Sequence, residues 1–197
     1  YKRQAYYPSP DATLDEAQEN KYRLIFDKLR LKEGDHHLDV GCGWGGMVRY
    51  AAKRGVKSLG VTLSKEQAEW GQAKIKEEGL EDLAEIRFMD YRDVTEEGFD
   101  AISAIGLLEH IGVKNYPDFF RFLNSKLKPG GLMLNHCITY PDNHKTPKGG
   151  FIDRYIFPDG ELSGSGTITK CMQDAGFEVV HTESLRFDYI RTLHDWC

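Results

Sequence analysis

Apolar residues follow two different periods along this chain, and the two periods alternate. Short continuous apolar runs of the kind that form buried strands alternate with stretches of helical periodicity. The predicted strands are a first one ending at Val40 and then 58–63, 85–89, 99–105, 132–139 and 177–182. The predicted helices are 13–30, 47–54, 64–79, 115–127 and 167–175. This alternation predicts an α/β fold, a mostly parallel, doubly wound sheet with helices on both faces.

Local signals mark several of these boundaries. Thr13 and Glu16 have the spacing of a capping box at the start of the first helix, and Ser64 and Gln67 repeat it before the third. Pro129-Gly130-Gly131 predicts a turn that closes helix 115–127. These signals agree with the periodicity about where elements begin and end.

The stretch 140–166 has little periodicity and is rich in proline and glycine. A loop of this length in a compact domain is usually a lid or a substrate-binding element. A disordered surface linker is the alternative. The aromatic residues Phe151, Tyr155 and Phe157 favour the lid, because such side chains need a surface to pack against.

Composition narrows the class of protein. With 197 residues, 40% of them hydrophobic and 29% charged, the chain is predicted to be a single globular domain, 1–197. A net charge of −5 argues against nucleic-acid binding, and no apolar run is long enough to span a bilayer. The four scattered cysteines predict neither a disulfide framework nor a metal site, and they favour a cytoplasmic location.

The candidate chemistry begins at a glycine-rich loop directly after the first strand. In an open parallel sheet, ligands bind beyond the carboxyl ends of the strands, where the strand order reverses. The loop has Asp39 two positions before its first glycine and then reads Gly41, Cys42, Gly43, Trp44, Gly45. Its spacing differs from the dinucleotide pattern G-x-G-x-x-G and resembles the E/D-x-G-x-G-x-G loop of class I S-adenosylmethionine-dependent methyltransferases. A tight turn without a ligand is the alternative.

The same resemblance implies further cofactor contacts at later strand ends. The second strand would meet the ribose, and this chain has a threonine where an acidic residue is usual. The third would meet the adenine, with a tyrosine ring packed on the purine, and the fourth would lie near the sulfonium. These expected contacts are Thr62, Leu63, Ser64 and Gln67, then Asp90, Tyr91 and Arg92, then Ile105 and Gly106. Asp90 is also a candidate for a simple turn cap.

Further segments make the resemblance more specific. They run in order along nearly the whole chain and resemble the cyclopropane-fatty-acid synthase family. They are Thr13 to Gln18, Leu38 to Gly45, Gly60 to Gln67, Ile105 to Gly112, His136 to Ile138 and Tyr155 to Gly160. This family continues past the Tyr-x-x-Thr-Leu-x-x-Trp segment, so we expect the chain to be truncated at its C-terminus, before the seventh strand.

The family resemblance implies a reaction and a set of residues. The cofactor methyl adds to a cis double bond of an unsaturated phospholipid acyl chain. The resulting cation then loses a proton to bound bicarbonate, which leaves a cyclopropane ring or a methyl branch. The implied holders of bicarbonate are Glu109, His136, the Ile138 backbone and Tyr189. Taken singly, Glu109 is also typical of a helix start, and His136 and Tyr189 of core residues. The family's cysteine near the N-terminus is replaced here by Gln4.

The family resemblance also implies a cytoplasmic protein that contacts the inner face of the membrane transiently. Whether it forms a homodimer is left open. Two other functions also stay open from the residues alone. The first is methylation of a small amine or hydroxyl substrate, with His136 or Tyr189 as general base. The second is a non-catalytic domain that binds S-adenosylmethionine.

Overall fold

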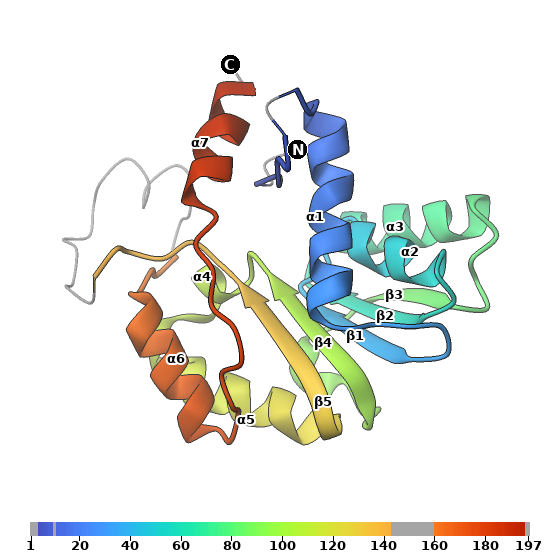
Figure 1. The fold of residues 1–197 in the computed structure, drawn as a ribbon. Coiled ribbons are helices and arrows are strands. Elements are labelled where there is room, and N and C mark those ends of the chain that lie inside the picture. Colours follow the sequence, from blue (N-terminus) through green and yellow to red (C-terminus); the bar gives the residue numbers. More distant parts are fainter. Residues whose placement is uncertain (1–3, 10, 143–159, 196–197) are drawn as a thin grey trace.

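The fold is built on one sheet of five parallel strands in the order β3-β2-β1-β4-β5. The structure is a computed structural model that describes residues 4–9, 11–142 and 160–195. The strands are β1 (His36–Val40), β2 (Lys57–Thr62), β3 (Ala84–Phe88), β4 (Phe99–Ile105) and β5 (Leu127–His136). The chain runs outward from β1 to β3 on one side and from β4 to β5 on the other. The strand order therefore reverses between β1 and β4 (Figure 1).

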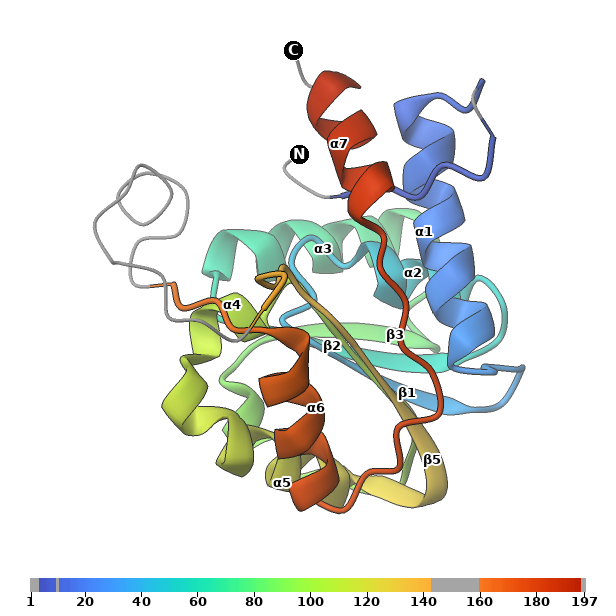
Figure 2. The same ribbon diagram turned by 60° about the vertical axis from the view of Figure 1, so that its left-hand side comes forward.

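Helices cover both faces of this sheet, as predicted (Figures 1 and 2). One face packs on α1 (Leu14–Lys28), α2 (Gly46–Ala52) and α3 (Lys65–Glu77). The other packs on α4 (Leu108–Ile111), α5 (Tyr116–Lys126) and α6 (Ser165–Asp174). Two short 3₁₀ helices, η1 (Tyr91–Asp93) and η2 (Val113–Asn115), join elements at the carboxyl edge of the sheet.

The predicted helix caps form with one difference. Thr13 accepts from the Glu16 amide while Glu16 reaches back to the Thr13 amide, which completes the capping box of α1. Ser64 likewise accepts from the Gln67 amide at the start of α3. The side chain of Gln67 does not complete a box, because its oxygen accepts from the hydroxyl of Thr62 at 2.8 Å instead.

The prediction for the fifth strand was wrong at both ends. Pro129-Gly130-Gly131 does not form a turn between helix and strand. It lies inside β5, where the pairing with β4 shifts between Phe99 and Ala101 and Gly130 has a φ of 78°. The turn signal therefore marks a bulge. The strand stops at His136 rather than 139, since the amide of Ile138 donates to the carboxylate of Glu109 and not to a neighbouring strand.

The predicted sixth strand at 177–182 is also wrong. These residues form no strand, and Val179 and Val180 are 37% and 69% exposed. A strand needs a neighbouring backbone for its amide and carbonyl groups. Within the described residues, β5 pairs with β4 alone, so this apolar segment has no partner strand.

The two ends of the described chain are fastened together. Helix α7 (Arg186–Asp195) lies beside α1 in both ribbon views. The peptide between Gln4 and Ala5 is held from both sides: its carbonyl accepts from Lys21 of α1, and its amide donates to Thr192 of α7. Arg191 adds hydrogen bonds from α7 to the carbonyls of residues 9 and 12. We call residues 4–9 with these contacts the N-terminal clamp.

Two further expectations concern the chain as a whole. The predicted lid at 140–166 falls mostly outside the described residues, as do Phe151, Tyr155 and Phe157. Its described ends meet in a parallel bridge between Tyr140 and Gly164. Among the described helices, none is both long and apolar enough to cross a membrane.

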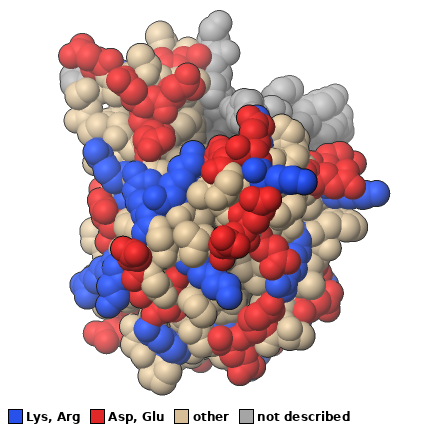
Figure 3. All heavy atoms as spheres, turned by 90° about the vertical axis from the view of Figure 1, so that its right-hand side faces the viewer, with Lys and Arg blue, Asp and Glu red and all other residues tan. Residues whose placement is uncertain are grey.

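The surface that carries α2 and α3 mixes charges of both signs. Figure 3 shows Lys and Arg side chains interspersed with Asp and Glu across this face. On this side of the molecule there is thus no continuous basic stripe of the kind that tracks a nucleic-acid backbone.

Candidate active site

The glycine loop follows β1 at the reversal of strand order and requires glycine on steric grounds. Gly41 and Gly45 both have a φ of 70°, a region that side chains with a Cβ rarely adopt. A Cβ on Gly41 would lie 2.9 Å from the Cδ1 of Leu107, and one on Gly45 would overlap the Cδ1 of Ile86. The loop therefore packs closely between the ends of β3 and β4.

The side chains within the loop point in different directions. The thiol of Cys42 is buried among residues of α2 and α3, so of this predicted cofactor residue only the backbone lies in the loop. The ring of Trp44 is partly exposed and meets Trp70 of α3 edge-on at 5.3 Å. The amides of Gly41 and Cys42 both donate to the carbonyl of Val61, which ties the loop to β2.

Below the loop, Asp39 ends a row of hydrogen-bonded polar side chains inside the sheet. Its carboxylate accepts from the hydroxyl of Ser103 at 2.5 Å. Ser103 also meets the Nε2 of His37 at 2.9 Å, and the Nδ1 of His37 meets the hydroxyl of Ser58 at 2.8 Å. All four residues are at most 3% exposed. We call Ser58, His37, Ser103 and Asp39 the buried polar chain.

The end of β2 provides a polar pair, buried Thr62 with half-buried Gln67, and an exposed apolar side chain. The hydroxyl of Thr62 donates to Gln67 and accepts from the Ser64 amide, so it is already engaged within the protein. Leu63 is 71% exposed beside them. Such a surface suits the flat apolar part of a ligand, whose burial against Leu63 is favourable.

The end of β3 forms the turn cap that the sequence left open as an alternative for Asp90. Asp90 caps η1 by accepting from the Arg92 amide, and it also pairs with the Arg92 guanidinium at 2.7 Å. Arg92 holds the pKa of the Asp90 carboxyl below its usual value. The ring of Tyr91 packs edge-on against Phe119 and Phe122 of α5, at 5.2 and 5.6 Å, so its packing partners are core rings.

Glu109 is the most unusual group at the carboxyl edge. It lies in α4, just past β4, and is 3% exposed. One of its oxygens, Oε1, accepts from the Ile138 amide at 2.8 Å. The other, Oε2, is buried without a hydrogen-bond partner among the described residues. A buried carboxylate oxygen without a donor is costly, so this position is suited to a ligand that donates a proton.

The charge of Glu109 acts on three ionisable side chains, those of Cys137, Tyr189 and Tyr116. Burial and the Glu109 charge together raise the pKa of Cys137 to about 12 and that of Tyr189 above its ordinary value. Burial raises the pKa of Tyr116 to about 12, with smaller contributions from its neighbours, Glu109 among them. All three therefore keep their protons at neutral pH and are potential donors around this carboxylate.

His136 ends β5 on the same edge but in a different environment. Burial, and then the charges of Lys21 and Lys28 of α1, lower the pKa of His136 to about 3. The imidazole is therefore neutral at physiological pH and can act as an acceptor. In the described residues no hydrogen bond joins His136 to Glu109. The structure thus joins Glu109 to Ile138 by a hydrogen bond, places Tyr189 where the Glu109 charge acts on its pKa, and places His136 on the α1 side of the same edge.

The remaining predicted contact, at the end of β4, faces open space. A Cβ on Gly106 would meet no atom of the described residues within 4 Å, and the Gly106 amide donates to the His136 carbonyl at 2.8 Å. Ile105 just before it is half-buried. The chain therefore leaves room between the glycine loop and Glu109.

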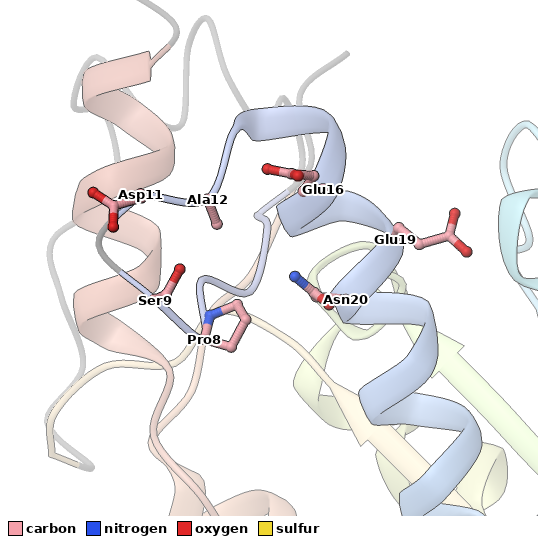
Figure 4. A pocket seen from close by; sticks show the side chains of 7 residues that line it. All are labelled: Pro8, Ser9, Asp11, Ala12, Glu16, Glu19 and Asn20. Atoms are coloured by element: carbon pink, nitrogen blue, oxygen red, sulfur yellow. The ribbon is translucent and has the colours of Figure 1, made fainter.

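A separate hollow of about 430 Å³ lies away from this edge, between the segment before α1 and α1 itself (Figure 4). Its lining includes Asp11, Glu16 and Glu19. These carboxylates give it an acidic character that does not suit a lipid. It belongs to the outside of the N-terminal clamp and not to the candidate site.

Known proteins share this fold and sequence. The family described as mycolic acid cyclopropane synthetase matches residues 3–197. This chain belongs to that family. A probable fatty acid methyltransferase of Mycobacterium tuberculosis is 65% identical over 194 residues, which are 98% of this chain and 45% of that protein. The cyclopropane-fatty-acyl-phospholipid synthase of Escherichia coli is 37% identical over 195 residues, 98% of this chain and 48% of that one.

Solved structures of cyclopropane synthases confirm the fold class. The mycolic acid cyclopropane synthase CmaA1 complexed with SAH and CTAB superposes with a TM-score of 0.88 and 33% identity. The alignment covers all of this chain and 73% of that one. The cyclopropane synthase MmaA2 from Mycobacterium tuberculosis gives 0.90 and 32%, with the same coverage. The chain spans about half the length of the curated relatives it matches.

Sequence reasoning missed several residues of the site. Tyr116 lies outside every segment that carries the family resemblance, and Cys137 lies within the segment His136 to Ile138 but was given no role. The charge of Glu109 contributes to the raised pKa of both. The buried polar chain was also missed. Its only signal in the sequence is that His37 and Asp39 interrupt an apolar strand two residues apart, which places both on one face.

Proposed function

We propose that this chain is the cofactor-binding and catalytic region of an S-adenosylmethionine-dependent lipid methyltransferase. The acceptor is a cis double bond in an unsaturated acyl chain of a phospholipid, and the product is a cyclopropane ring or a methyl branch. The observation that carries the proposal is Glu109, buried at the open edge with one unpaired carboxylate oxygen. Family membership supports the lipid acyl chain as the substrate class.

The cofactor assignment rests on the edge of the sheet around the switch point. S-adenosylmethionine supplies the methyl group when bound. The backbone from Gly41 to Gly45 would hold its methionine part, Thr62, Leu63, Ser64 and Gln67 would border the ribose and adenine, and the space before Gly106 would take the sulfonium. In this assignment, Asp90 with Arg92 borders the adenine as a rigid ion-paired turn rather than as a free carboxylate.

Bicarbonate fits the residues around Glu109. When bound, it would supply the base that removes the proton from the reacting acyl chain. The unpaired Oε2 of Glu109 would accept the hydrogen of its hydroxyl, and the Tyr189 hydroxyl would donate to it. Neutral His136 would border it on the α1 side. The Ile138 amide already donates to Glu109, so its role is to orient that carboxylate.

A phospholipid acceptor also determines where in the cell the protein would meet its substrate. An acyl chain of a membrane phospholipid must be reached from the membrane surface, so we infer transient contact with the inner membrane face. CmaA1 was solved in a complex with CTAB. Nothing in the described residues bears on whether the protein is a homodimer.

The test is to incubate the full-length protein with labelled S-adenosylmethionine and separate panels of unsaturated phospholipids and small amines. Mass spectrometry of the products then identifies the acceptor. We expect labelled lipid whose mass rises by one CH₂ with loss of the double bond, or with a methyl branch. Label in the amines alone would overturn the lipid assignment, and cofactor binding without any product would favour a non-catalytic domain.

A further inference from the structure

The buried polar chain packs among apolar side chains on the face of the sheet that α1 and α2 cover. His37, Asp39 and Ser103 share the face of the sheet on which Ala101 packs against Met47 and Ala51. Polar groups buried in such surroundings do not stabilise a fold more than apolar side chains that fill the same volume. Stability alone therefore gives no reason for this arrangement.

The hydrogen bonds of the buried polar chain all run in one direction, from Ser58 toward Asp39. Ser103 has one proton and donates it to Asp39, so its oxygen accepts from the Nε2–H of His37. Neutral His37 then has an unprotonated Nδ1, which accepts from the hydroxyl of Ser58. Every proton in the chain thus points toward Asp39. The 2.5 Å separation between Ser103 and Asp39 is within the range for a hydroxyl that donates to a carboxylate.

The buried polar chain also crosses the point where the strand order reverses. Ser58 comes from β2, His37 and Asp39 from β1, and Ser103 from β4. Asp39 is two residues before Gly41, so its carboxylate is held where β1 passes into the glycine loop. The loop and the end of β4 are the two walls of the space assigned above to the cofactor.

We propose that Ser103 and His37 are positioning residues that hold Asp39 in the orientation required for binding the methionine part of S-adenosylmethionine. The inference rests on the proposed cofactor site and names residues that no motif of the sequence indicates. Ser103 acts directly on Asp39. His37 acts through Ser103, by filling its acceptor and so leaving its proton for Asp39.

The test compares serine-to-alanine variants at the two serines of the buried polar chain. Ser103→Ala removes the donor to Asp39, whereas Ser58→Ala removes a hydroxyl of the same chain, equally buried, at the far end from Asp39. Isothermal titration calorimetry with S-adenosylhomocysteine gives the Kd, and thermal unfolding gives the Tm. We expect Ser103→Ala to raise the Kd about tenfold, Ser58→Ala to change it less than twofold, and both to lower the Tm similarly.

Two more variants keep the test decisive. Ser103→Thr retains the hydroxyl and is expected to restore the Kd to within threefold of wild type. Should Ser103→Ala fail to fold, His37→Leu removes the donor to Ser103 at nearly constant volume and is expected to raise the Kd at least threefold. Equal Kd values for wild type and the folded variants, with only the Tm lowered, would overturn the positioning role. A wild-type chain that does not bind S-adenosylhomocysteine would instead overturn the cofactor site.

Discussion

At the scale of single residues, buried ionisable groups set most of the chemistry. Glu109 and the two buried histidines lie within a few residues of strand ends, yet their environments differ. Glu109 has one oxygen without a hydrogen-bond partner among the described residues, His136 is held neutral beside two lysines, and His37 is neutral inside the sheet. Their contacts assign these roles, and residue type alone does not.

We expect Glu109→Gln to abolish turnover on phospholipid in the full-length protein, by at least a hundredfold, with cofactor affinity changed only a few-fold. The amide oxygen can still accept from Ile138, but an NH₂ group replaces the oxygen that accepts from the bound anion. Steady-state kinetics with labelled cofactor measures the effect. Glu161→Gln is the control, because Glu161 binds the Val113 amide near the same helix. Unchanged turnover in Glu109→Gln would exclude the bicarbonate mechanism.

His37 is expected to make the fold sensitive to acid. Burial lowers its pKa to about 3, from about 6.5 in the unfolded chain, so between these values the unfolded state binds more protons and stability falls as pH falls. From pH 7 to pH 5 this amounts to roughly 2 kcal/mol.

The measurement is urea denaturation of wild type and His37→Gln at both pH values. The variant lacks the titrating group, so its free energy of unfolding should fall about 2 kcal/mol less than that of wild type over this interval. The other histidines are common to both proteins and cancel in the comparison. Parallel pH profiles would show that His37 is not a buried neutral group.

At the scale of elements, α7 depends on the N-terminal clamp. Its hydrogen bonds to segments outside the helix go mainly to residues 5–12, and it carries Tyr189, whose pKa is raised by burial and by the charge of Glu109. Thr192 is fully buried, accepts from the Ala5 amide and donates back to the Asp188 carbonyl. The clamp thus links the start of the chain to the position of a candidate catalytic side chain.

Thr192→Val keeps the shape of this side chain and removes its hydroxyl. We expect local destabilisation of α7 by about 1–3 kcal/mol, because the Ala5 amide is then buried without an acceptor. Hydrogen exchange followed by mass spectrometry should show faster exchange in 4–9 and 186–195, with the strands unchanged. Thr95→Val is the matched control at an exposed site. Faster exchange throughout the sheet would mean that the clamp supports the whole fold and not α7 in particular.

At the scale of the whole molecule, the carboxyl ends of β1, β2, β3 and β4 place the loop, Leu63, Asp90, Gly106 and Glu109 along one edge of the sheet. All of these residues directly follow strands of one continuous sheet that lies within this chain.

We therefore expect the 197-residue chain to bind S-adenosylhomocysteine by itself. At a hundredfold excess over Kd, a single site stabilises a protein by about 2.7 kcal/mol, which corresponds to a rise in Tm of about 5–10 °C at this size. Differential scanning fluorimetry measures it. NAD at the same concentration is the control, since the loop lacks the dinucleotide spacing. No shift with S-adenosylhomocysteine at millimolar concentration would contradict the assignment.

The sequence by itself determined the α/β fold, the caps of α1 and α3 and the family, because periodicity, capping and glycine spacing are local properties of the chain. It failed at Pro129-Gly130-Gly131 and at 177–182, where the same local signals serve a bulge and an unpaired segment. Pairing with another strand decides such cases, and pairing is not local.

Only the tertiary structure decided which polar groups meet. His37 is hydrogen-bonded to Ser58, which is 21 residues away in the sequence, and to Ser103, which is 66 residues away. Glu109 and Ile138 are 29 apart, and Ala5 and Thr192 are 187 apart. A hydrogen bond depends on a few tenths of an ångström and on direction, which the packing of the sheet and its helices fixes. The sequence therefore pointed to the edge where the chemistry occurs, and the fold assigned the partner of each group.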